Sequence, residues 1–229
     1  MRKWLLLLTS VAGLAQATPP ARLEVTYEVS AKGVTLADIV ERLEHADGKY
    51  ELVETWHGRG LFSLRGSARR TSKGDVVAGG LRPVDFADQR TGRDTARAHF
   101  DWAAKTLTME YREGPNTRPI PPNAQDRLSF LLAFAFLPPD VQPVKLSVAD
   151  GRGVSEYTFD RVGRERVKTP AGEFDAVKIV RRKDGPDDRR STEIWLAPSE
   201  GLIPVRIRVT EKDGMVLDQV VSKISVQKK

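Results

Sequence analysis

The chain has 229 residues, no cysteine, and 37 lysines and arginines against 31 aspartates and glutamates, which gives a formal net charge of +6 at pH 7. Without cysteine the fold has no disulfide bond, and the lipidated cysteine of bacterial lipoproteins is excluded. The modest excess of base is spread along the chain, which permits weak attraction to anionic lipid or polysaccharide surfaces but argues against a nucleic-acid partner.

The first residues carry the pattern of an export signal. The basic pair Arg2-Lys3 precedes an apolar stretch that begins at Trp4, and an Ala-Gln-Ala cleavage site ends at Ala17. The apolar stretch is shorter than the roughly 20 residues that cross a bilayer. We therefore predict a cleaved signal peptide over residues 1–17 and secretion. The rest, residues 18–229, is predicted to be one β-rich domain without a transmembrane span.

Alternating apolar and polar residues predict strands in the N-terminal half. Residues 22–31, RLEVTYEVSA, place every second side chain from Leu23 to Val29 on one apolar face. A turn and a weaker alternation follow over residues 46–56, and residues 98–111 have the pattern of a hairpin. Short turns between such strands favour antiparallel pairing of sequence neighbours.

The segment TLADIVERLEHA, residues 35–46, permits two interpretations. Its apolar residues from Leu36 to Leu43 keep helical spacing, which favours an amphipathic helix. The segment also lies between two predicted turns in a run of hairpins, which favours a strand. We predict a strand.

Paired prolines bracket an apolar segment, PPNAQDRLSFLLAFAFLPP at residues 121–139, which predicts a helix over Ala124–Leu137. Asn123 is placed to cap this helix, and Asp126 lies in the first turn, where the helix dipole favours negative charge. Because the helix is apolar on nearly every side, protein or ligand must cover it. We interpret it as a core helix inside a curved sheet, or as a wall or lid for an apolar ligand.

The last third of the chain repeats short strands separated by tight turns. Strand patterns lie at residues 145–162, 172–182, 191–210 and 215–226, with aspartate, glycine and proline residues at the turns between them. Many short strands joined in this way predict a mainly β fold, a meandering antiparallel sheet or barrel.

Within STEIWLAPSEGLIPVRIRVTEKDG, residues 191–214, a turn at 198–201 separates two strands. Ile194 and Leu196 share one face of the first strand, and Trp195 points to the other face, where it would cover the sheet or a cavity mouth. In the second strand, four β-branched residues face the core and two arginines point away: Ile203, Val205, Ile207 and Val209, then Arg206 and Arg208. We predict that this stretch forms the fold rather than a site.

The residue types that commonly carry catalysis show no motif. His45, His57 and His99 are the only histidines, and they lack the spacing of metal ligands. The sequence has no Gly-x-Ser-x-Gly nucleophile elbow and no phosphate-binding glycine loop. The stretches HGRG at 57–60 and DGRG at 150–153 are typical of turns and bulges. We therefore predict no catalytic residue, no metal site, no cofactor and no enzymatic activity.

Three stretches resemble the exported bacterial proteins of the domain of unknown function 3108 family: AQDRLSFLLAFAF, VADGRGVSEYTFDRVGRERVKTPAGEFDAVKIVRR and STEIWLAPSEGLIPVRIRVTEKDG. The resemblance runs from about Arg22 to Ile224 and is most specific at Gln125-Asp126-Arg127 and Trp195-Leu196-Ala197-Pro198. It implies a periplasmic location and an architecture similar to the LolA/LolB lipoprotein carriers, a half-open β-barrel with helices at its open side. It implies no catalytic residues, because the family has no established activity.

Two classes of function follow. In the first, the curved sheet encloses a cavity for a lipid or other apolar small molecule, lined or gated by Phe130, Phe134, Phe136 and Trp195; core packing is the alternative role of each. In the second, the helix fills the cavity, and the domain is an assembly module that contacts another envelope protein. The predicted contact clusters are basic: Arg65, Arg69, Arg70, Lys73, Arg181, Arg182, Lys183, Arg189 and Arg190. A connected apolar void of roughly several hundred Å³ would favour the first class.

Overall fold

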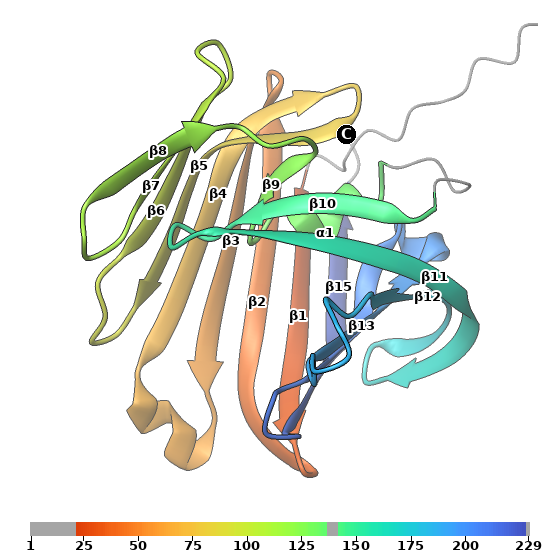
Figure 1. Cartoon of the computed structure of the whole chain (residues 1–229). Helices are drawn as coiled ribbons and strands as arrows, with labels where there is room; N and C mark the ends of the chain where they lie inside the picture. Colours follow the sequence, from red (N-terminus) through yellow and green to blue (C-terminus); the bar gives the residue numbers. More distant parts are fainter. Residues whose placement is uncertain (1–21, 137–141, 228–229) are drawn as a thin grey trace, which may run out of the picture.

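The computed structural model describes residues 22–136 and 142–227, which lie mainly in β-strands (Figure 1). The predicted signal peptide, residues 1–17, lies outside the described residues. The strands are β1 (Arg22–Ala31), β2 (Val34–Ala46), β3 (Lys49–Gly58), β4 (Ser67–Val77), β5 (Gly80–Arg90), β6 (Ala96–Asp101), β7 (Thr106–Glu110), β8 (Pro115–Pro119), β9 (Ala124–Asp126), β10 (Val144–Ala149), β11 (Val154–Thr169), β12 (Gly172–Arg181), β13 (Ser191–Ala197), β14 (Ile203–Thr210) and β15 (Val216–Gln227). Three short helical turns accompany them: η1 (Gly60–Arg65), α1 (Phe130–Ala133) and η2 (Pro198–Glu200).

The described strands form one sheet with the order β8-β7-β6-β5-β4-β3-β2-β1-β15-β14-β13-β12-β11-β10-β9. Among them β9 and β10 pair in parallel, and each of the other neighbouring pairs is antiparallel. Two meanders therefore run outward from the central β1–β15 pair. The sheet is strongly curved (Figure 1), so the prediction of a curved antiparallel sheet is confirmed.

The ambiguous segment at residues 35–46 lies in strand β2, as predicted. β2 pairs with β1 on one side and with β3 on the other, which satisfies its backbone along both edges. Its alternate residues Ala37, Ile39 and Leu43 point into the core and are at most 8% exposed. Pairing on two sides therefore overrides the helical spacing of the apolar residues.

The prediction of a helix over Ala124–Leu137 is wrong for most of its length. Helix α1 spans only Phe130–Ala133. Residues Ala124–Asp126 form β9 instead, which pairs with residues 147–149 of β10. Leu137 lies outside the described residues.

The predicted helix caps have other roles. Asn123 has a positive φ of 51° and donates its side-chain N–H to the carbonyl oxygen of Lys145, at 3.1 Å. Asp126 accepts the backbone N–H groups of Leu128 and Ser129, each at 2.8 Å, and so starts the turn that leads into α1. Because short helices are marginal by themselves, the backbone hydrogen bonds that β10 offers decide the conformation of β9.

A buried polar network anchors the corner between β9 and α1 on the first meander. The Asp126 carboxylate accepts a hydrogen bond from Ser72 of β4, and the Tyr50 hydroxyl lies 2.8 Å from the same Ser72 oxygen. Gln125 donates to the carbonyl oxygen of Leu81 in β5, at 3.1 Å. Burial raises the pKa of Asp126 to about 6, although hydrogen bonds from Ser72 and the backbone act to lower it. The network holds the end of the sheet against β4 and β5.

Two apolar clusters form the core of the domain. The first joins residues of β1 to β7 with residues of β9 to β15, and includes Val25, Tyr27, Ile39, Phe100, Leu107, Leu128 and Val205. The second packs α1 against β10 to β14, and includes Phe130, Phe134, Leu146, Phe159, Ile194 and Ile207. The apolar segment after β9 is therefore covered by protein over most of its described length.

The strand-turn-strand predicted within residues 191–214 is confirmed as β13 and β14, with one correction. Trp195 faces away from Ile194, as predicted, and packs in the first cluster. A β-bulge just after Trp195 shifts the register of β13 against β14. Ile203 and Val205 therefore join the first cluster and Ile207 joins the second, so they do not share one face.

Candidate functional site

A groove of about 1000 Å³ lies in the curve of the sheet. Apolar side chains from α1 and three strands line it: Phe130, Leu131, Tyr157, Phe159, Ile194, Ile207 and Val209. The groove also reaches Glu54, Trp56 and Arg70 on the inner face of β3 and β4. Further charged side chains line the groove beside the apolar ones, among them Arg127, Arg181, Asp187, Asp188, Arg190 and Glu211. The groove thus combines an apolar part with a strongly charged part.

Contacts between aromatic rings hold the apolar side of the groove in place. Phe134 meets Phe159 edge-on, with ring centres 5.2 Å apart, and Phe159 meets Tyr157 at 6.1 Å. Phe130 lies 6.5 Å from the Tyr157 ring. Because such tilted pairs are preferred over parallel sandwiches, α1 and β11 fix each other's aromatic side chains.

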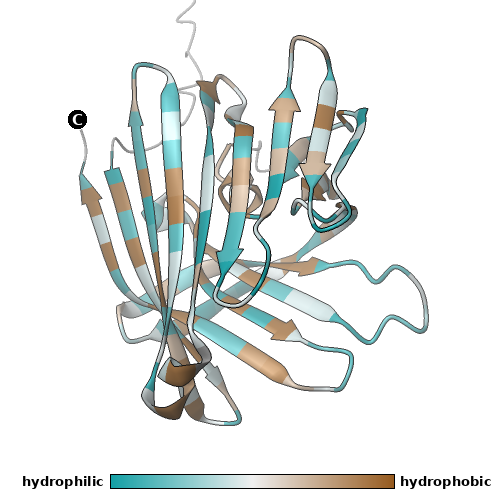
Figure 2. Cartoon of the chain, turned by 90° about the vertical axis from the view of Figure 1, so that its left-hand side faces the viewer, coloured by the Kyte–Doolittle hydropathy of each residue, from teal (hydrophilic) through white to brown (hydrophobic). Residues whose placement is uncertain are grey.

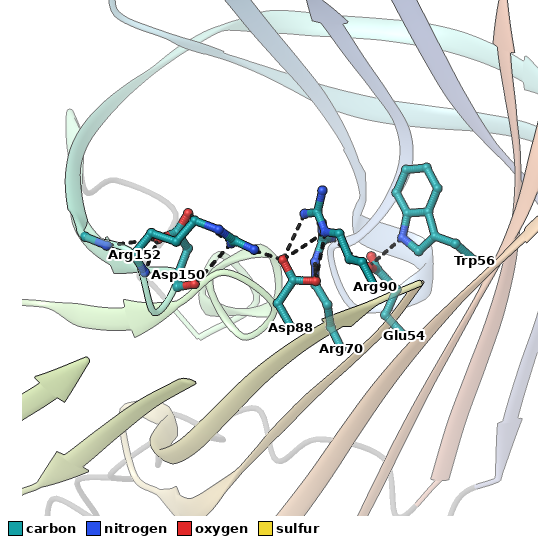
Figure 3. Close-up of polar contacts among 8 residues, drawn as sticks. Glu54, Trp56, Arg70, Asp88, Arg90, Asp150 and Arg152 are labelled. Carbon is teal, nitrogen blue, oxygen red and sulfur yellow. Dashed lines mark hydrogen bonds and ion pairs between the residues drawn. The ribbon is translucent and has the colours of Figure 1, made fainter. Parts of the chain in front are cut away.

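Four charged side chains cross the inner face of the first meander in register. Glu41 on β2 lies opposite Glu54 on β3, Glu54 lies opposite Arg70 on β4, and Arg70 lies opposite Asp88 on β5. All three carboxyl residues are buried, and the Arg70 side chain is 15% exposed. We call this set the charged ladder; Figure 3 shows its part from Glu54 to Asp88.

Asp88, at one end of the charged ladder, receives guanidinium groups from three sides (Figure 3). Arg90 donates at 2.8 to 3.1 Å, Arg152 donates at 3.2 Å, and Arg70 Nε lies 3.5 Å away. Burial acts to raise the pKa of Asp88, but the hydrogen bond from Arg90 and the charge of Arg70 hold it below its usual value.

The Asp88–Arg152 contact ties the turn between β10 and β11 to the first meander. Gly151 in this turn lies so close to β6 that a β carbon there would be 2.6 Å from a backbone nitrogen. Only glycine fits such an approach, which brings Arg152 within reach of Asp88. The charged ladder therefore joins the two meanders across the interior.

The other end of the charged ladder is a pair of buried carboxyl groups. Glu54 accepts hydrogen bonds from Trp56 Nε1 and Arg70 Nη1, each at 2.7 Å. Burial, followed by the negative charge of Glu54, raises the pKa of Glu41 to about 8. Glu41 is thus mainly protonated at pH 7 and donates to Glu54. Within the described part of the chain, Glu41 Oε1 has no hydrogen-bond partner.

Arg181 holds the loop between β12 and β13 beside the groove. Its guanidinium group binds Asp184 at 3.0 Å and Asp188 at 2.5 Å, and lies 5.8 Å from the centre of the Tyr157 ring. Arg181 is 8% exposed. Two members of the predicted basic contact clusters, Arg70 and Arg181, therefore form internal ion pairs.

The described residues contain no group of three His, Cys, Asp or Glu side chains placed to hold a metal ion. One of the histidines, His99, lies 2.8 Å from Asp85 on the exposed face of the first meander. Within residues 22–136 and 142–227, no helix has the length and apolar character needed to span a bilayer.

The sequence profile of DUF3108, a family of proteins of unknown function, matches residues 26–220. The chain belongs to the DUF3108 family. A search of curated proteins finds no match. Among solved structures, a β-barrel-like protein of the DUF1849 family from Brucella abortus has a TM-score of 0.60 and 10% identity, over 93% of this chain and 100% of that one. This likeness supports a barrel-like fold and nothing beyond the fold.

Two other solved structures are similar to this DUF3108 protein at lower scores. A predicted lipoprotein from Parabacteroides distasonis has a TM-score of 0.37 and 11% identity, over 91% of this chain and 96% of that one. A predicted exported protein with a YmcC-like fold from Bacteroides fragilis has a TM-score of 0.40 and 12% identity, over 90% and 96%. The similarity to LolA/LolB carriers stays a prediction.

The DUF3108 structure places the four predicted ligand-binding aromatic residues in different surroundings. Phe130 lines the groove. Phe134 is 5% exposed and packs behind the groove in the second cluster, while Phe136 packs against the first cluster. Trp195 lies on the other face of the sheet and is 2% exposed. Of the four, Phe130 is therefore the residue that stays a candidate for ligand contact.

Sequence analysis missed the charged ladder, although the sequence carries a signal for it. In residues 49–58, Glu54 and Trp56 have the same parity as the buried residues Tyr50 and Leu52. The inward face of this strand therefore carries a carboxylate, as Glu41 does on the neighbouring strand. A charge at an inward position of a strand needs a buried partner, and so indicates a polar site inside the sheet.

Replacing Trp195 by phenylalanine in this DUF3108 protein is expected to lower the free energy of unfolding by about 1–2 kcal/mol. The indole donates to Glu165 at 3.0 Å, and Lys178, Arg206 and Arg208 lie 4.7 to 5.7 Å from its ring centre. Urea denaturation followed by circular dichroism measures the loss. Ligand affinity should not change, and weaker binding at unchanged stability would contradict the placement of Trp195 outside the groove.

Proposed function

We propose that this protein is exported to the periplasm, where it binds a lipid or another apolar molecule in the groove and catalyses no reaction. The pattern of basic, apolar and small residues over residues 1–17 supports export. The absence of a catalytic motif in the sequence supports binding rather than chemistry. The groove itself is the observation that carries the proposal.

The size and lining of the groove suit an amphiphile. Its volume of about 1000 Å³ is at the upper end of the range of about 300–1,000 Å³ that small-molecule sites occupy. An acyl chain beside Phe130, Tyr157 and Ile207 would gain about 0.8 kcal/mol for each CH₂ removed from water. Glu54 and Arg70 would then contact a polar head group, because they line the same groove.

The open groove favours ligand binding over the hypothesis of a filled core. With only four residues, Phe130–Ala133, α1 is too short to fill the curve of the sheet. Arg70 and Arg181, which the assembly hypothesis assigns to a contact surface, are engaged with Glu54 and Asp188. An envelope protein as partner is therefore the less favoured alternative.

Replacing Val209 by tryptophan is expected to weaken the binding of a fluorescent fatty acid about tenfold or more, which corresponds to at least about 1.4 kcal/mol. Val209 is half-buried and lines the groove, so an indole at this position would occupy the space of an acyl chain. Thr210→Trp is the matched control, because Thr210 is equally half-buried but points to the opposite face of β14. Equal affinity of the two variants, or no binding by the unmodified protein, would contradict the proposal.

A further inference from the structure

The arginines that line the groove differ in one respect, which is whether a carboxylate neutralises them. Three of them are ion-paired: Arg70 with Glu54 at 2.7 Å, Arg181 with Asp188 at 2.5 Å, and Arg190 with Glu211 at 3.4 Å. Arg127 also lines the groove. Within residues 22–136 and 142–227, its guanidinium group has neither an ion-pair partner nor a hydrogen-bond acceptor. Arg127 therefore brings an uncompensated positive charge to the groove.

Arg127 projects from a corner whose backbone is held on both sides. Its own N–H donates to the carbonyl oxygen of Ala149 in β10, at 2.9 Å. The preceding Asp126 is fully buried and fixes the turn through the backbone N–H groups that it accepts. Residues 128–130, which follow, are at most 6% exposed, whereas Arg127 is exposed. The buried neighbours therefore leave this one side chain directed outward from the corner.

The Arg127 guanidinium group is placed at the apolar wall of the groove. Its central carbon lies over the Phe130 ring, 5.6 Å from the ring centre, and Phe130 belongs to that wall. The ring attracts the cation without using any of its N–H groups. Those five donors form a planar fork that matches the oxygen atoms of a carboxylate or a phosphate. Because the ring already restrains the side chain, binding such an anion costs less conformational entropy.

The other unpaired charges of the groove lining lie in different surroundings. Many strands in Figure 2 carry alternating hydrophobic and hydrophilic bands, because successive side chains of a strand point to opposite faces. Glu156 therefore points away from the face of β11 on which Tyr157 contacts α1. Asp187 and Lys212 are exposed on two connecting loops and carry opposite charges. The unpaired charge that stands directly at the apolar wall is thus the positive charge of Arg127.

We propose that the ligand of the groove is an acidic amphiphile, whose carboxylate or phosphate group binds Arg127 while its apolar chain lies along the aromatic wall at Phe130. This inference rests on the proposed function and names the charge of its ligand. Arg70 adds polar contacts but no uncompensated charge, because it is already paired with Glu54. Hydrogen bonds from arginine to an oxyanion are roughly twice as strong as those between neutral groups. Arg127 therefore selects an acid over a neutral amphiphile of the same chain length.

The test compares four amphiphiles that share one alkyl chain and differ in the head group: dodecanoate, dodecyl phosphate, dodecanol and dodecyltrimethylammonium. Each one competes with a neutral fluorescent dye, phenylnaphthylamine, for the full chain, below its micelle concentration. We expect at least one of the two acids to bind about tenfold more tightly than dodecanol, or better. The acid that binds more tightly identifies the head group as a carboxylate or a phosphate. The ammonium compound should bind no more tightly than dodecanol.

The Arg127→Gln variant is expected to lose this preference, so that the affinity ratio of acid to dodecanol falls to about twofold or less. Its melting temperature should stay unchanged, because Arg127 is exposed. Arg69→Gln is the matched control. It removes the same charge from an exposed position on β4, and Arg69 points to the face opposite that of its neighbour Arg70, which lines the groove. This control should keep the ratio of the unmodified protein.

The outcomes separate this inference from the proposed function. Equal affinity of the unmodified protein for dodecanol and for both acids would overturn the inference and leave the proposed function standing. An unchanged ratio in Arg127→Gln would overturn it as well, and so would tighter binding of the ammonium compound than of either acid. If the dye does not bind, or none of the four amphiphiles displaces it, the proposed function fails and the inference falls with it.

Discussion

Replacing Asp88 by alanine is expected to lower the free energy of unfolding by about 3–5 kcal/mol, the usual cost of removing one partner from a buried ion pair. Asp88 is 2% exposed and neutralises Arg70, Arg90 and Arg152. Without it, the partly buried Arg70 retains an ion pair with Glu54 alone, and Arg152 loses its ion pair across the interior. Urea denaturation of the purified variant measures the difference in free energy.

The control for this prediction is Asp85→Ala on the same strand. The Asp85 side chain is 64% exposed and pairs with His99, so its loss should change the free energy of unfolding by about 0.5 kcal/mol or less. If Asp88→Ala does not fold, Asp88→Asn, which keeps the shape and loses the charge, gives the measurement. Equal stability of the Asp88 and Asp85 variants would refute the role given to the charged ladder.

Replacing Glu41 by glutamine is expected to stabilise the protein at high pH and to remove a pH dependence. The Glu41 pKa is raised from 4.5 to about 8 by burial and by Glu54. The folded state therefore holds this proton more tightly than the unfolded state. The stabilisation of the folded state by the proton on Glu41 is complete below about pH 4.5 and is lost as the pH rises toward 8. Glutamine stays neutral and still donates to Glu54, so it keeps the stabilising form at every pH.

Thermal unfolding between pH 4.5 and 9 measures this effect. The Glu41→Gln variant should match the unmodified protein at the acid end and exceed it at pH 9 by on the order of 4 kcal/mol, which is roughly 10 °C in melting temperature for a chain of this size. Glu44→Gln on the same strand is the control, because the Glu44 side chain is 58% exposed and should leave the pH profile unchanged. A variant with the same pH profile as the unmodified protein would show that Glu41 is not the buried proton site.

Local pattern predicts most of the strands because each one has an apolar face and a polar face. In β1, the residues at alternate positions from Leu23 to Val29 are all buried, as the alternation predicts. The same argument fails at residues 124–137, where an apolar run is compatible with either a helix or a covered loop. There the conformation depends on hydrogen bonds to β10 and β4, which lie far away in the sequence. No local pattern contains those contacts.

The site was predictable only in part, and for a similar reason. The apolar segment that contains Phe130 indicated a wall for a ligand, and Phe130 lines the groove. The charged ladder depends on the register of four strands, which sets Glu54 opposite Arg70 and Arg70 opposite Asp88. A shift of one residue in the pairing of a strand would turn its side chains to the other face of the sheet. The register of the pairing cannot be read from the local sequence pattern. For Trp195 the sequence permits either a place at a cavity or packing in the core, and the structure places its side chain in the first cluster.

Mass spectrometry of lipids that stay with the protein through purification tests the central claim most directly. The unmodified protein and Thr210→Trp should each release an amphiphile in near-equal amount to protein, and Val209→Trp should release little or none. If the unmodified protein carries no amphiphile and takes none up from added fatty acid, the groove is not a binding site and the account is wrong. The same conclusion holds if Val209→Trp carries as much as Thr210→Trp.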